Sequence, residues 1–455
     1  MKYKRKSVVL LLCCGATLSG AFAQTLTTIA RFDGADGSDP YGPLVQGLDG
    51  SLYGTTWQGG ANAICDLTCG TVYKVSPGGV LTNLHSFAGT DGFSPWAGLV
   101  QASGGVFYGT TYFGGSGFGE TGNCESNFGC GTFFRITSKG DLTSLYSFDL
   151  TAYYPKGGVV EGADGNFYGI TFNSDEGYGV GTVFRIMAGG VMTVLHSFTS
   201  TDGAFPYAPL IQGMDGNFYG TTLMGGTSDV GTVFKITPAG ALTTLYSFGN
   251  DGIEPQAALV QGSDGNFYGT TSQGGAYAYG TIFKMAPDGT FTTLYSFPGN
   301  YAANALVEGS DGNFYGTTGS TVFRITPAGV FTTLYTFPAD SYIQAALTQS
   351  TNGTFYGTTT GYGGTVFALS VGLGPFVKSR PTFGSRGSSV AILGTDLTGA
   401  IQVTFDGKPS AFTVVSGSEI LATVPSGAET GIIQVTSPSA VLSGDRPFVV
   451  VPGPK

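Results

Sequence analysis

Short segments in which apolar and polar residues alternate recur along most of this chain. Phe267–Thr271, Gly280–Lys284 and Phe291–Phe297 alternate in this way, and Asp264-Gly265-Asn266 precedes the first of them. Alternation with a period of two residues is the pattern of a half-buried β-strand. Asp-Gly and Pro-x-Gly sequences between such segments are typical of hairpin turns, because glycine accepts the positive φ that these turns need. The pattern predicts an all-β chain of short strands and tight turns.

A unit of four such strands repeats seven times. The second strand carries the motif Phe-Tyr-Gly-Thr-Thr or a variant of it, with its tyrosine at Tyr53, Tyr108, Tyr168, Tyr219, Tyr268, Tyr315 and Tyr356. The first strand carries an apolar residue nine positions before each tyrosine, at Leu44, Leu99, Val159, Leu210, Leu259, Leu306 and Leu347. A fixed spacing of this kind is typical of a repeat architecture.

The loop between the second and third strands, in contrast, varies in length. The motif tyrosine is 24 residues from the third strand in one copy (Tyr108 to Thr132) and 6 residues in another (Tyr315 to Thr321). Because antiparallel strands alternate in direction, the turns of fixed length share one edge of the sheets, which we call the constant edge. The loops of variable length share the opposite edge, the variable edge, and varied loops on a fixed scaffold commonly carry binding.

The two ends of the repeat region complement each other. A strand of the fourth type first occurs at Leu26–Phe32, with no earlier strands of its own unit, and the last unit ends at Gly364–Leu369 without a fourth strand. We therefore predict a seven-bladed β-propeller over residues 24–371, in which the N-terminal strand closes the last blade and no sheet edge stays open. An open β-solenoid is the alternative.

After Gly372 the repeat stops and a different alternating pattern begins. Pairs such as Val390/Ile392 and Val403/Phe405 indicate short strands with one buried face. For residues 372–455 this pattern predicts a small immunoglobulin-like β-sandwich.

Both regions resemble known families. The unit "LVQGSDGNFYGTTSQGG…GTIFKM" resembles the Gloeo/Verruco (GloVer, choice-of-anchor) tandem repeats of exported bacterial proteins, and "SSVAILGTDL…ILATVPSGAETGIIQVTS" resembles an IPT/TIG domain. The first resemblance implies extracellular placement and brings no catalytic residue. Members often end in a Pro-Glu-Pro sorting signal or another anchor, whereas this chain ends Val451-Pro452-Gly453-Pro454-Lys455, so the resemblance leaves open whether and how the protein is anchored. The second resemblance implies a spacer or an adhesive module.

The first 23 residues have the pattern of a secretory signal peptide. Lys2–Lys6 is basic, Val8–Leu12 is apolar, and Ala21-Phe22-Ala23 is a small-x-small cleavage site. No later stretch has the roughly 20 apolar residues of a transmembrane segment. The mature protein is therefore expected to be secreted, at the cell surface or extracellular. In an oxidising compartment its four cysteines would form two local disulfides, Cys65–Cys69 and Cys124–Cys130; a four-thiolate zinc site is the alternative.

Composition and charge narrow the class of partner. Charged residues make up only 11% of the 455 residues and aromatic residues 13%, and 19 basic against 29 acidic residues give a net charge of −10. So many aromatic residues and so few charges are unlike a disordered chain. An acidic chain without a basic stripe is not expected to bind nucleic acid or other acidic polymers.

Few residues carry the patterns of catalysis. The two histidines, His85 and His196, occupy fourth-strand positions where other copies have tyrosine, so we interpret them as structural. HExxH, GxSxG and P-loop motifs do not occur in the sequence. A glycosidase needs two carboxylates across a sugar site, and acidic residues that lie in variable loops are Glu120, Glu125, Asp175 and Glu176. A carbohydrate-active enzyme, a glycosidase or polysaccharide lyase, therefore stays an alternative.

No cofactor is expected, although one loop could hold calcium. Asp33, Asp36 and Asp39 place three carboxylates in the segment before the first complete unit. Carboxylate oxygens on a flexible loop are calcium ligands, but the spacing matches no complete calcium motif. The Asp-Gly turns at the constant edge, such as Asp264-Gly265, are interpreted as turn-forming.

Aromatic residues at the variable edge are the predicted ligand-binding residues, since flat rings stack on sugar faces and peptide groups. They are Trp57, Trp96, Tyr41, Tyr112, Phe113 and Tyr207. Packing between blades is the alternative for these rings. Loop lengths place the predicted groove where the last blade meets the first, walled by Trp57 and the loops 57–70 and 112–131.

The sequence thus predicts an exported, non-catalytic binding or adhesion protein whose partner is an extracellular glycan, neutral in charge, or a protein. Besides the enzyme, a purely structural envelope or matrix protein is an alternative. The oligomeric state is left open.

Overall fold

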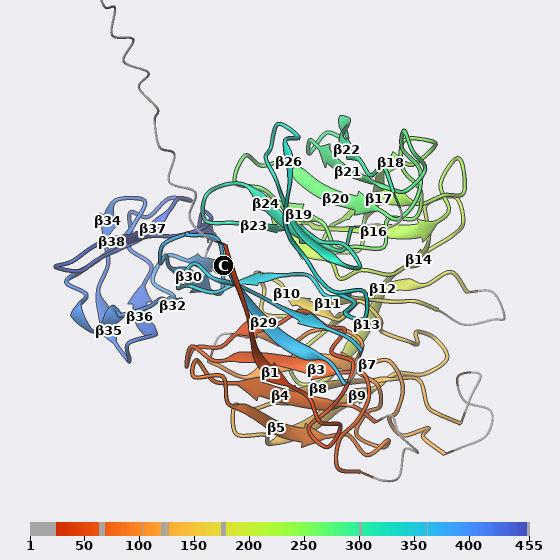
Figure 1. Ribbon diagram of the computed structural model, residues 1–455, viewed down its shortest axis with the longest axis horizontal. Coiled ribbons are helices and arrows are strands. Elements are labelled where there is room, and N and C mark those ends of the chain that lie inside the picture. Colours follow the sequence, from red (N-terminus) through yellow and green to blue (C-terminus); the bar gives the residue numbers. More distant parts are fainter. Residues whose placement is uncertain are drawn as a thin grey trace, which may run out of the picture.

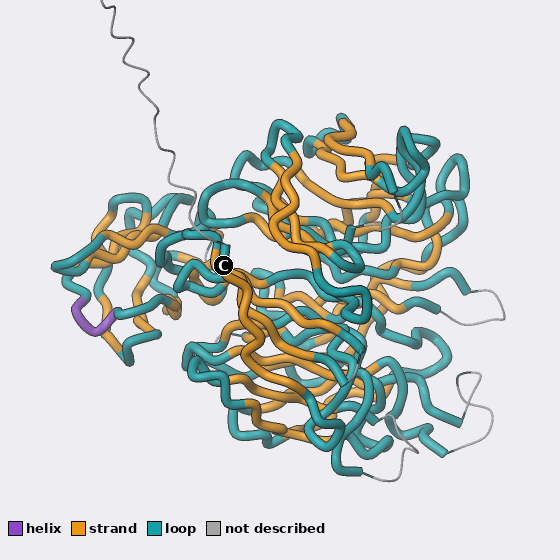
Figure 2. The backbone as a smooth tube through the Cα atoms, viewed as in Figure 1, coloured by secondary structure: helices purple, strands orange, loops and turns teal. Residues whose placement is uncertain are grey.

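The computed structural model describes residues 24–62, 69–102, 104–119, 124, 127–173, 179–299, 303–361 and 363–452. The predicted signal peptide, residues 1–23, lies outside these ranges, and so do Cys65, Glu120, Glu125, Asp175 and Glu176. Within the ranges the chain consists of strands and loops, apart from one 3₁₀ turn, η2 (Leu397–Gly399) (Figure 2). The prediction of an all-β chain is confirmed.

The repeat region, residues 24–371, forms antiparallel sheets that follow one another along the chain (Figure 1). The first three sheets contain β2 (Val45–Gln46), β3 (Leu52–Thr56), β4 (Thr71–Val75) and β5 (Leu81–Ser86); β6 (Val100–Gln101), β7 (Phe107–Thr111), β8 (Thr132–Ile136) and β9 (Leu142–Ser147); and β10 (Val159–Glu161), β11 (Phe167–Thr171), β12 (Thr182–Ile186) and β13 (Met192–Ser197).

The later sheets keep this order. They contain β14 (Ala204–Pro206), β15 (Ile211–Gln212), β16 (Phe218–Met224), β17 (Thr232–Ile236) and β18 (Leu242–Ser247); β19 (Val260–Gln261), β20 (Phe267–Thr271), β21 (Thr281–Met285) and β22 (Phe291–Ser296); β23 (Val307–Glu308), β24 (Phe314–Thr317), β25 (Thr321–Ile325) and β26 (Phe331–Thr336); and β27 (Thr348–Gln349), β28 (Phe355–Thr359) and β29 (Thr365–Ser370). In the fourth sheet β14 and β15 both pair with β16.

The last of these sheets takes its fourth strand from the start of the chain. β1 (Thr25–Arg31) pairs antiparallel with β29, with Thr25 opposite Ser370 and Arg31 opposite Thr365. Next to this pair the Thr358 hydroxyl donates to the Pro40 carbonyl oxygen at 2.8 Å. The first and last units of the repeat region are therefore in contact.

The repeated motif explains how neighbouring sheets pack. Six of the seven motif tyrosines lie against the phenylalanine before the next motif tyrosine, with ring centroids 3.9 to 4.2 Å apart. The pairs are Tyr53–Phe107, Tyr108–Phe167, Tyr168–Phe218, Tyr219–Phe267, Tyr268–Phe314 and Tyr315–Phe355. The first unit has leucine at the phenylalanine position, and Leu52 shares a hydrophobic cluster with Tyr356. Aromatic pairs of this kind stabilise a core beyond the area that they bury.

The Asp-Gly turns have a structural role that the motif itself sets. Five motif tyrosines donate their hydroxyl, at 2.8 to 3.0 Å, to the aspartate four residues earlier, which is Asp49, Asp164, Asp215, Asp264 or Asp311. The same carboxylate accepts the backbone N–H two residues on, as Asp264 does from Asn266 at 3.0 Å. The aspartates therefore fix the turn and the ring that packs against the next sheet.

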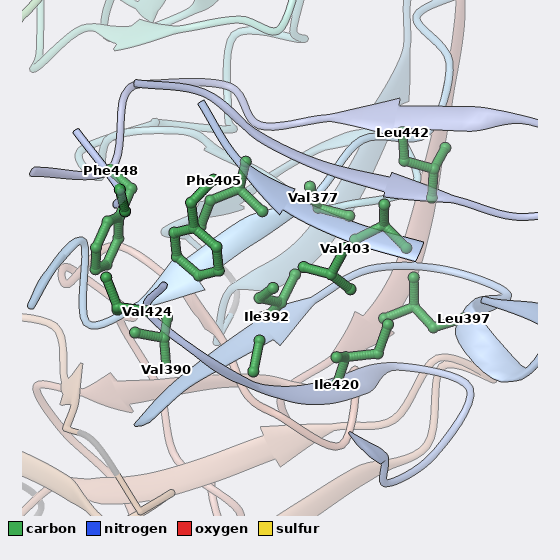
Figure 3. Packing of buried hydrophobic residues seen from close by; sticks show 14 residues of the cluster. Val377, Val390, Ile392, Leu397, Val403, Phe405, Ile420, Val424, Leu442 and Phe448 are labelled. Carbon is green, nitrogen blue, oxygen red and sulfur yellow. The ribbon is translucent and has the colours of Figure 1, made fainter. Parts of the chain in front are cut away.

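The C-terminal region, residues 372–452, forms two four-stranded sheets and a parallel pair. The sheets contain β30 (Lys378–Arg380), β32 (Ser389–Leu393), β36 (Glu419–Thr423) and β35 (Phe412–Val414), and β34 (Lys408–Pro409), β33 (Gln402–Phe405), β37 (Ile433–Thr436) and β38 (Val441–Ser443); the pair is β31 (Phe383–Ser385) and β39 (Val449–Val451). Buried side chains from both sheets meet in one core, among them Ile392 and Ile420 of one sheet and Val403 and Phe405 of the other (Figure 3).

The C-terminal region contacts the repeat region at the constant edge. The Ser418 hydroxyl donates to the Leu48 carbonyl oxygen at 2.8 Å, in the turn between β2 and β3, and the Lys378 ammonium donates to the Gln349 carbonyl oxygen at 2.6 Å. A cavity of about 470 Å³ lies between the regions, with Met214 on one side and Phe383 on the other. The variable edge faces away from these contacts.

Candidate ligand-binding site

One position of the repeat converges on a single cavity. The residue three positions before the apolar residue of the first strand is of five different types in the seven units, and all seven of these residues line a cavity of about 590 Å³. We call them the convergent residues: Tyr41, Trp96, Lys156, Tyr207, Gln256, Ala303 and Gln344. They precede the first strand, which runs towards the constant edge, so the cavity lies at the variable edge, where the units meet. Its volume is in the range of small-ligand sites.

The local backbone explains how each unit presents its convergent residue. In five units a proline comes directly before it, and the residue before that proline is in the left-handed region, with φ between 51° and 61°, at Asp39, Ser94, Tyr154, Phe205 and Glu254. Left-handed φ is uncommon outside glycine. Hydrogen bonds on both sides hold it here, since the N–H of Ser94 donates to the Cys69 carbonyl oxygen and its own carbonyl oxygen accepts from the N–H of Tyr112.

The cavity has two chemically different halves. The first four units supply three half-buried aromatic rings and one lysine, whereas Gln256 and Gln344 from later units are exposed amides and Ala303 is small. Asn304 adds another amide, whose nitrogen donates to the Ile343 carbonyl oxygen at 3.0 Å. One wall can therefore stack on an apolar face, and the other can exchange hydrogen bonds with hydroxyl groups.

The aromatic wall is a continuous cluster. The centroid of the Trp96 ring lies 4.9 Å from that of Tyr41, 4.9 Å from that of Trp57 and 6.4 Å from that of Tyr207. Tyr112 lies 6.5 Å from Trp96, and Phe113 lies 4.6 Å from Tyr112. The six aromatic residues singled out from the sequence thus come together. Tyr41, Trp96 and Tyr207 line the cavity. Trp57 and Tyr112 lie against Trp96, and Phe113 lies against Trp57 and Tyr112.

A disulfide supports this cluster from behind. Cys124 and Cys130 are bonded, with Cα atoms 5.3 Å apart, and Tyr154 donates its hydroxyl to the Cys124 carbonyl oxygen. The Tyr154 ring is stacked on Tyr112 with centroids 4.7 Å apart. Cys69 is also disulfide-bonded.

Lys156 is the residue of this site that sequence reasoning missed. Its ammonium lies 4.2 Å from the centroid of the Trp96 ring and 3.8 Å from that of Tyr207, and the rings of Tyr112 and Phe172 are 5.8 and 5.5 Å away. Burial among these rings lowers the pKa of Lys156 to about 8. Its place directly after Pro155, like Trp96 after Pro95, was the signal that could have found it.

The groove predicted between the last and first units stays a prediction, and the cavity described above is not confined to that place. Loop lengths indicate only how far a loop can project, whereas the cavity depends on where side chains converge, and it is lined by residues of all seven units. Parts of the loops 57–70 and 112–131 lie outside the described residues.

The other candidate residues have local structural partners. His85 and His196 pair with Asp91 and Asp202 at 2.8 and 3.0 Å, in fourth-strand positions where Tyr246 bonds Asp251 instead. In the calcium candidate, the carboxylates of Asp33 and Asp36 accept backbone N–H groups of their own loop. Among the described residues no group of three or more His, Cys, Asp or Glu side chains is arranged to hold a metal ion.

The fold and the cavity define a class: an all-β repeat protein with a ligand-sized cavity where its repeats converge. Comparison of the sequence with models of protein families identifies the family of each region. The Gloeobacter/Verrucomicrobia repeat model matches residues 17–214 and 172–370, and the IPT/TIG domain model matches residues 377–449. The chain belongs to the Gloeobacter/Verrucomicrobia repeat family and carries a C-terminal IPT/TIG domain, as the sequence resemblance indicated.

Solved structures share the fold at low sequence identity. A streptogramin B lyase is 15% identical, with a TM-score of 0.57 over 76% of this chain and 97% of its own. Virginiamycin B lyase from Staphylococcus aureus is 15% identical, with a TM-score of 0.56 over 76% and 99%. PorZ, a surface component of the type-IX secretion system of Porphyromonas gingivalis, is 16% identical, with a TM-score of 0.50 over 91% of this chain and 59% of its own. No curated protein sequence matches.

At these identities the likeness concerns the fold alone.

No helix in the described part of the chain has the length and hydrophobicity needed to cross a membrane.

Proposed function

We propose that this chain is an exported, non-catalytic binding protein that holds an extracellular ligand in the cavity formed by the convergent residues. In this proposal residues 24–371 are a closed, seven-bladed β-propeller and residues 372–455 are the IPT/TIG domain. The pairing of β1 with β29 and the seven successive sheets support the closed propeller. The signal-peptide pattern of residues 1–23 supports export.

The observation that carries the proposal is the lining of the cavity. Three aromatic rings, one lysine, two exposed glutamines and otherwise mainly small or apolar residues line it in the described structure. Rings stack on the apolar faces of a ligand and amides exchange hydrogen bonds with its hydroxyls. A cavity with one aromatic wall and one amide-bearing wall suits a saccharide. Its concave shape suits a small ligand or the end of a saccharide chain better than a flat protein surface.

Contact of the IPT/TIG domain with the constant edge also fits this proposal. Its contacts at Leu48 and Gln349 leave the variable edge free of the C-terminal region. The domain can therefore act as the spacer or docking module while the opposite edge meets the ligand.

The test is a binding screen of the mature chain, residues 24–455, against immobilised glycans. We expect a specific glycan to bind, and Trp96→Ala to weaken its binding at least about tenfold, as loss of a central aromatic contact does. Because Trp96 also packs on its neighbours, Gln344→Ala provides a second variant whose side chain is exposed. Tyr277→Ala, at an exposed tyrosine (58%) of a variable loop that does not line the cavity, is the control.

Equal loss of binding in Tyr277→Ala, or unchanged binding in both cavity variants, would place the ligand elsewhere. A screen without binding would favour a structural envelope or matrix role or a protein partner. Release of reducing ends or unsaturated products from a bound glycan would favour the carbohydrate-active enzyme.

A further inference from the structure

One side chain in the cavity is out of keeping with a neutral ligand. Lys156 is the only charged side chain among the described residues that line the cavity. Within the described part of the chain no carboxylate lies within ion-pair distance of its ammonium. The whole chain has 29 acidic and 19 basic residues, so acidic partners outnumber the basic residues. The lack of an acidic partner for Lys156 therefore distinguishes this cavity.

The surroundings of Lys156 hold the charge without neutralising it. Trp96 and Tyr207 lie on either side of the ammonium, and cation–π attraction to their faces offsets part of the desolvation cost. A buried cation is usually paired with an anion, because burial removes the water that would solvate it. The rings around Lys156 supply no negative charge, so the remaining cost is relieved when an anion enters the cavity.

We propose that the cavity binds a saccharide that bears a carboxylate, and that Lys156 is the residue that binds this carboxylate. The inference rests on the proposed function and names the class of ligand for the same cavity. It replaces the expectation of a neutral glycan, which came from the net charge of the whole chain.

The chemistry of the cavity favours a uronic-acid type of ligand over other anions. A single lysine matches the single charge of a carboxylate, whereas phosphate sites usually combine several donors such as arginine or backbone N–H groups. Aromatic rings beside the lysine can stack on the C–H face of the same sugar. Gln256 and Gln344, across the cavity, are placed to bond its hydroxyl groups.

The probes that test this inference are uronic-acid trisaccharides of galacturonate, mannuronate and guluronate, each with its methyl ester. Titration calorimetry with residues 24–455 should show at least one acid binding about tenfold or more tightly than its ester, since charged hydrogen bonds are the stronger ones. Lys156→Gln should bind the acid and the ester with nearly equal affinity. Lys139→Gln, which removes an exposed charge in a turn of the constant edge, is the matched control and should leave the preference intact.

The outcomes separate this inference from the proposed function. If esters bind as well as acids, or Lys156→Gln keeps the preference, the inference is overturned while the cavity remains a binding site. The same holds if a neutral glycan binds and no acid does. If neither acids nor any neutral glycan bind, both proposals fail. Trp96→Ala should weaken acid and ester alike, because it removes the stacking surface and not the charge.

The pH dependence provides a second readout. Burial lowers the pKa of Lys156 to about 8, so the free protein loses this charge as the pH rises through 8. The titratable groups facing Lys156 are tyrosines, and burial raises the pKa of Tyr41 and of Tyr207, with Asp39 adding to the shift of Tyr41. Affinity for the acid should therefore fall by at most about fivefold between pH 8 and pH 9, and affinity for the ester should not. Equal pH dependence of both would contradict a role for Lys156.

Discussion

The pairing of β1 with β29 leads to a sharp test of closure. Phe32 directly follows β1 and is buried, with 5% of its surface exposed, and its ring lies edge-on to Tyr73 with centroids 4.9 Å apart. Phe198 occupies the equivalent place after β13, within one continuous unit, with 4% exposed and 5.2 Å to Phe234. If the first strand completes the last blade, Phe32 belongs to the core as fully as Phe198 does.

We therefore expect Phe32→Ala and Phe198→Ala to lower the free energy of unfolding by similar amounts. Removal of a buried phenylalanine side chain costs about 3–5 kcal/mol, because the transfer energy is lost and a cavity remains. Urea denaturation of each variant, followed by fluorescence, measures the two losses. A loss below about 0.5 kcal/mol for Phe32→Ala, the size of an ordinary surface substitution, beside a large one for Phe198→Ala would refute closure through β1.

Two further predictions concern the loops and turns. Replacing Cys124 and Cys130 together with serine should lower the free energy of unfolding by about 2 kcal/mol, the chain-entropy value for so short a loop. It should also weaken ligand binding, because Tyr154, which bonds Cys124 and stacks on Tyr112, loses its support. Unchanged thermal denaturation and unchanged binding would show that the disulfide supports neither the fold nor the site. Partial burial opposes ionisation of Asp264, but hydrogen bonds from Lys284, Asn266 and Tyr268 outweigh it and lower the pKa of this carboxyl to about 2. Its contribution to stability is therefore complete above about pH 4 and is lost as the pH falls towards 2. The free energy of unfolding of Asp264→Asn should therefore fall less steeply between about pH 4 and pH 2 than that of the unchanged protein, as acid denaturation curves would show.

Much of the fold could be predicted because the same four-strand pattern occurs seven times in the sequence. The fixed nine-residue spacing to each motif tyrosine marks a hairpin of constant geometry, and the fourth-type strand at Leu26–Phe32 matches the missing strand after Gly364–Leu369. The contact of the C-terminal region with Leu48 and Gln349 could not be predicted, because it depends on surface complementarity between segments far apart in the chain.

The candidate site could be predicted only in part. Trp96 and Tyr207 stand out in the sequence because aromatic residues follow a proline in equivalent places. Lys156 occupies the same place, but a lysine in a sequence is ordinarily a solvated surface charge, and only the rings of other units around it change its chemistry. Loop lengths, which place the predicted groove, contain no information on where seven separate side chains converge.

The convergent residues also bear on how specificity can evolve in this family. Each belongs to a segment held by its own backbone hydrogen bonds, outside the paired strands and the tyrosine–phenylalanine stacks that join the sheets. A substitution at one of them therefore changes the lining of the cavity and leaves the paired strands in place, and exchange of a whole repeat replaces one part of that lining. Trp96 contacts Tyr41, Lys156 and Tyr207, so changes at these positions are coupled, whereas Gln256 and Gln344 are exposed. The seven positions together form a combinatorial recognition surface, and randomising their codons is a route to engineered binders on this scaffold.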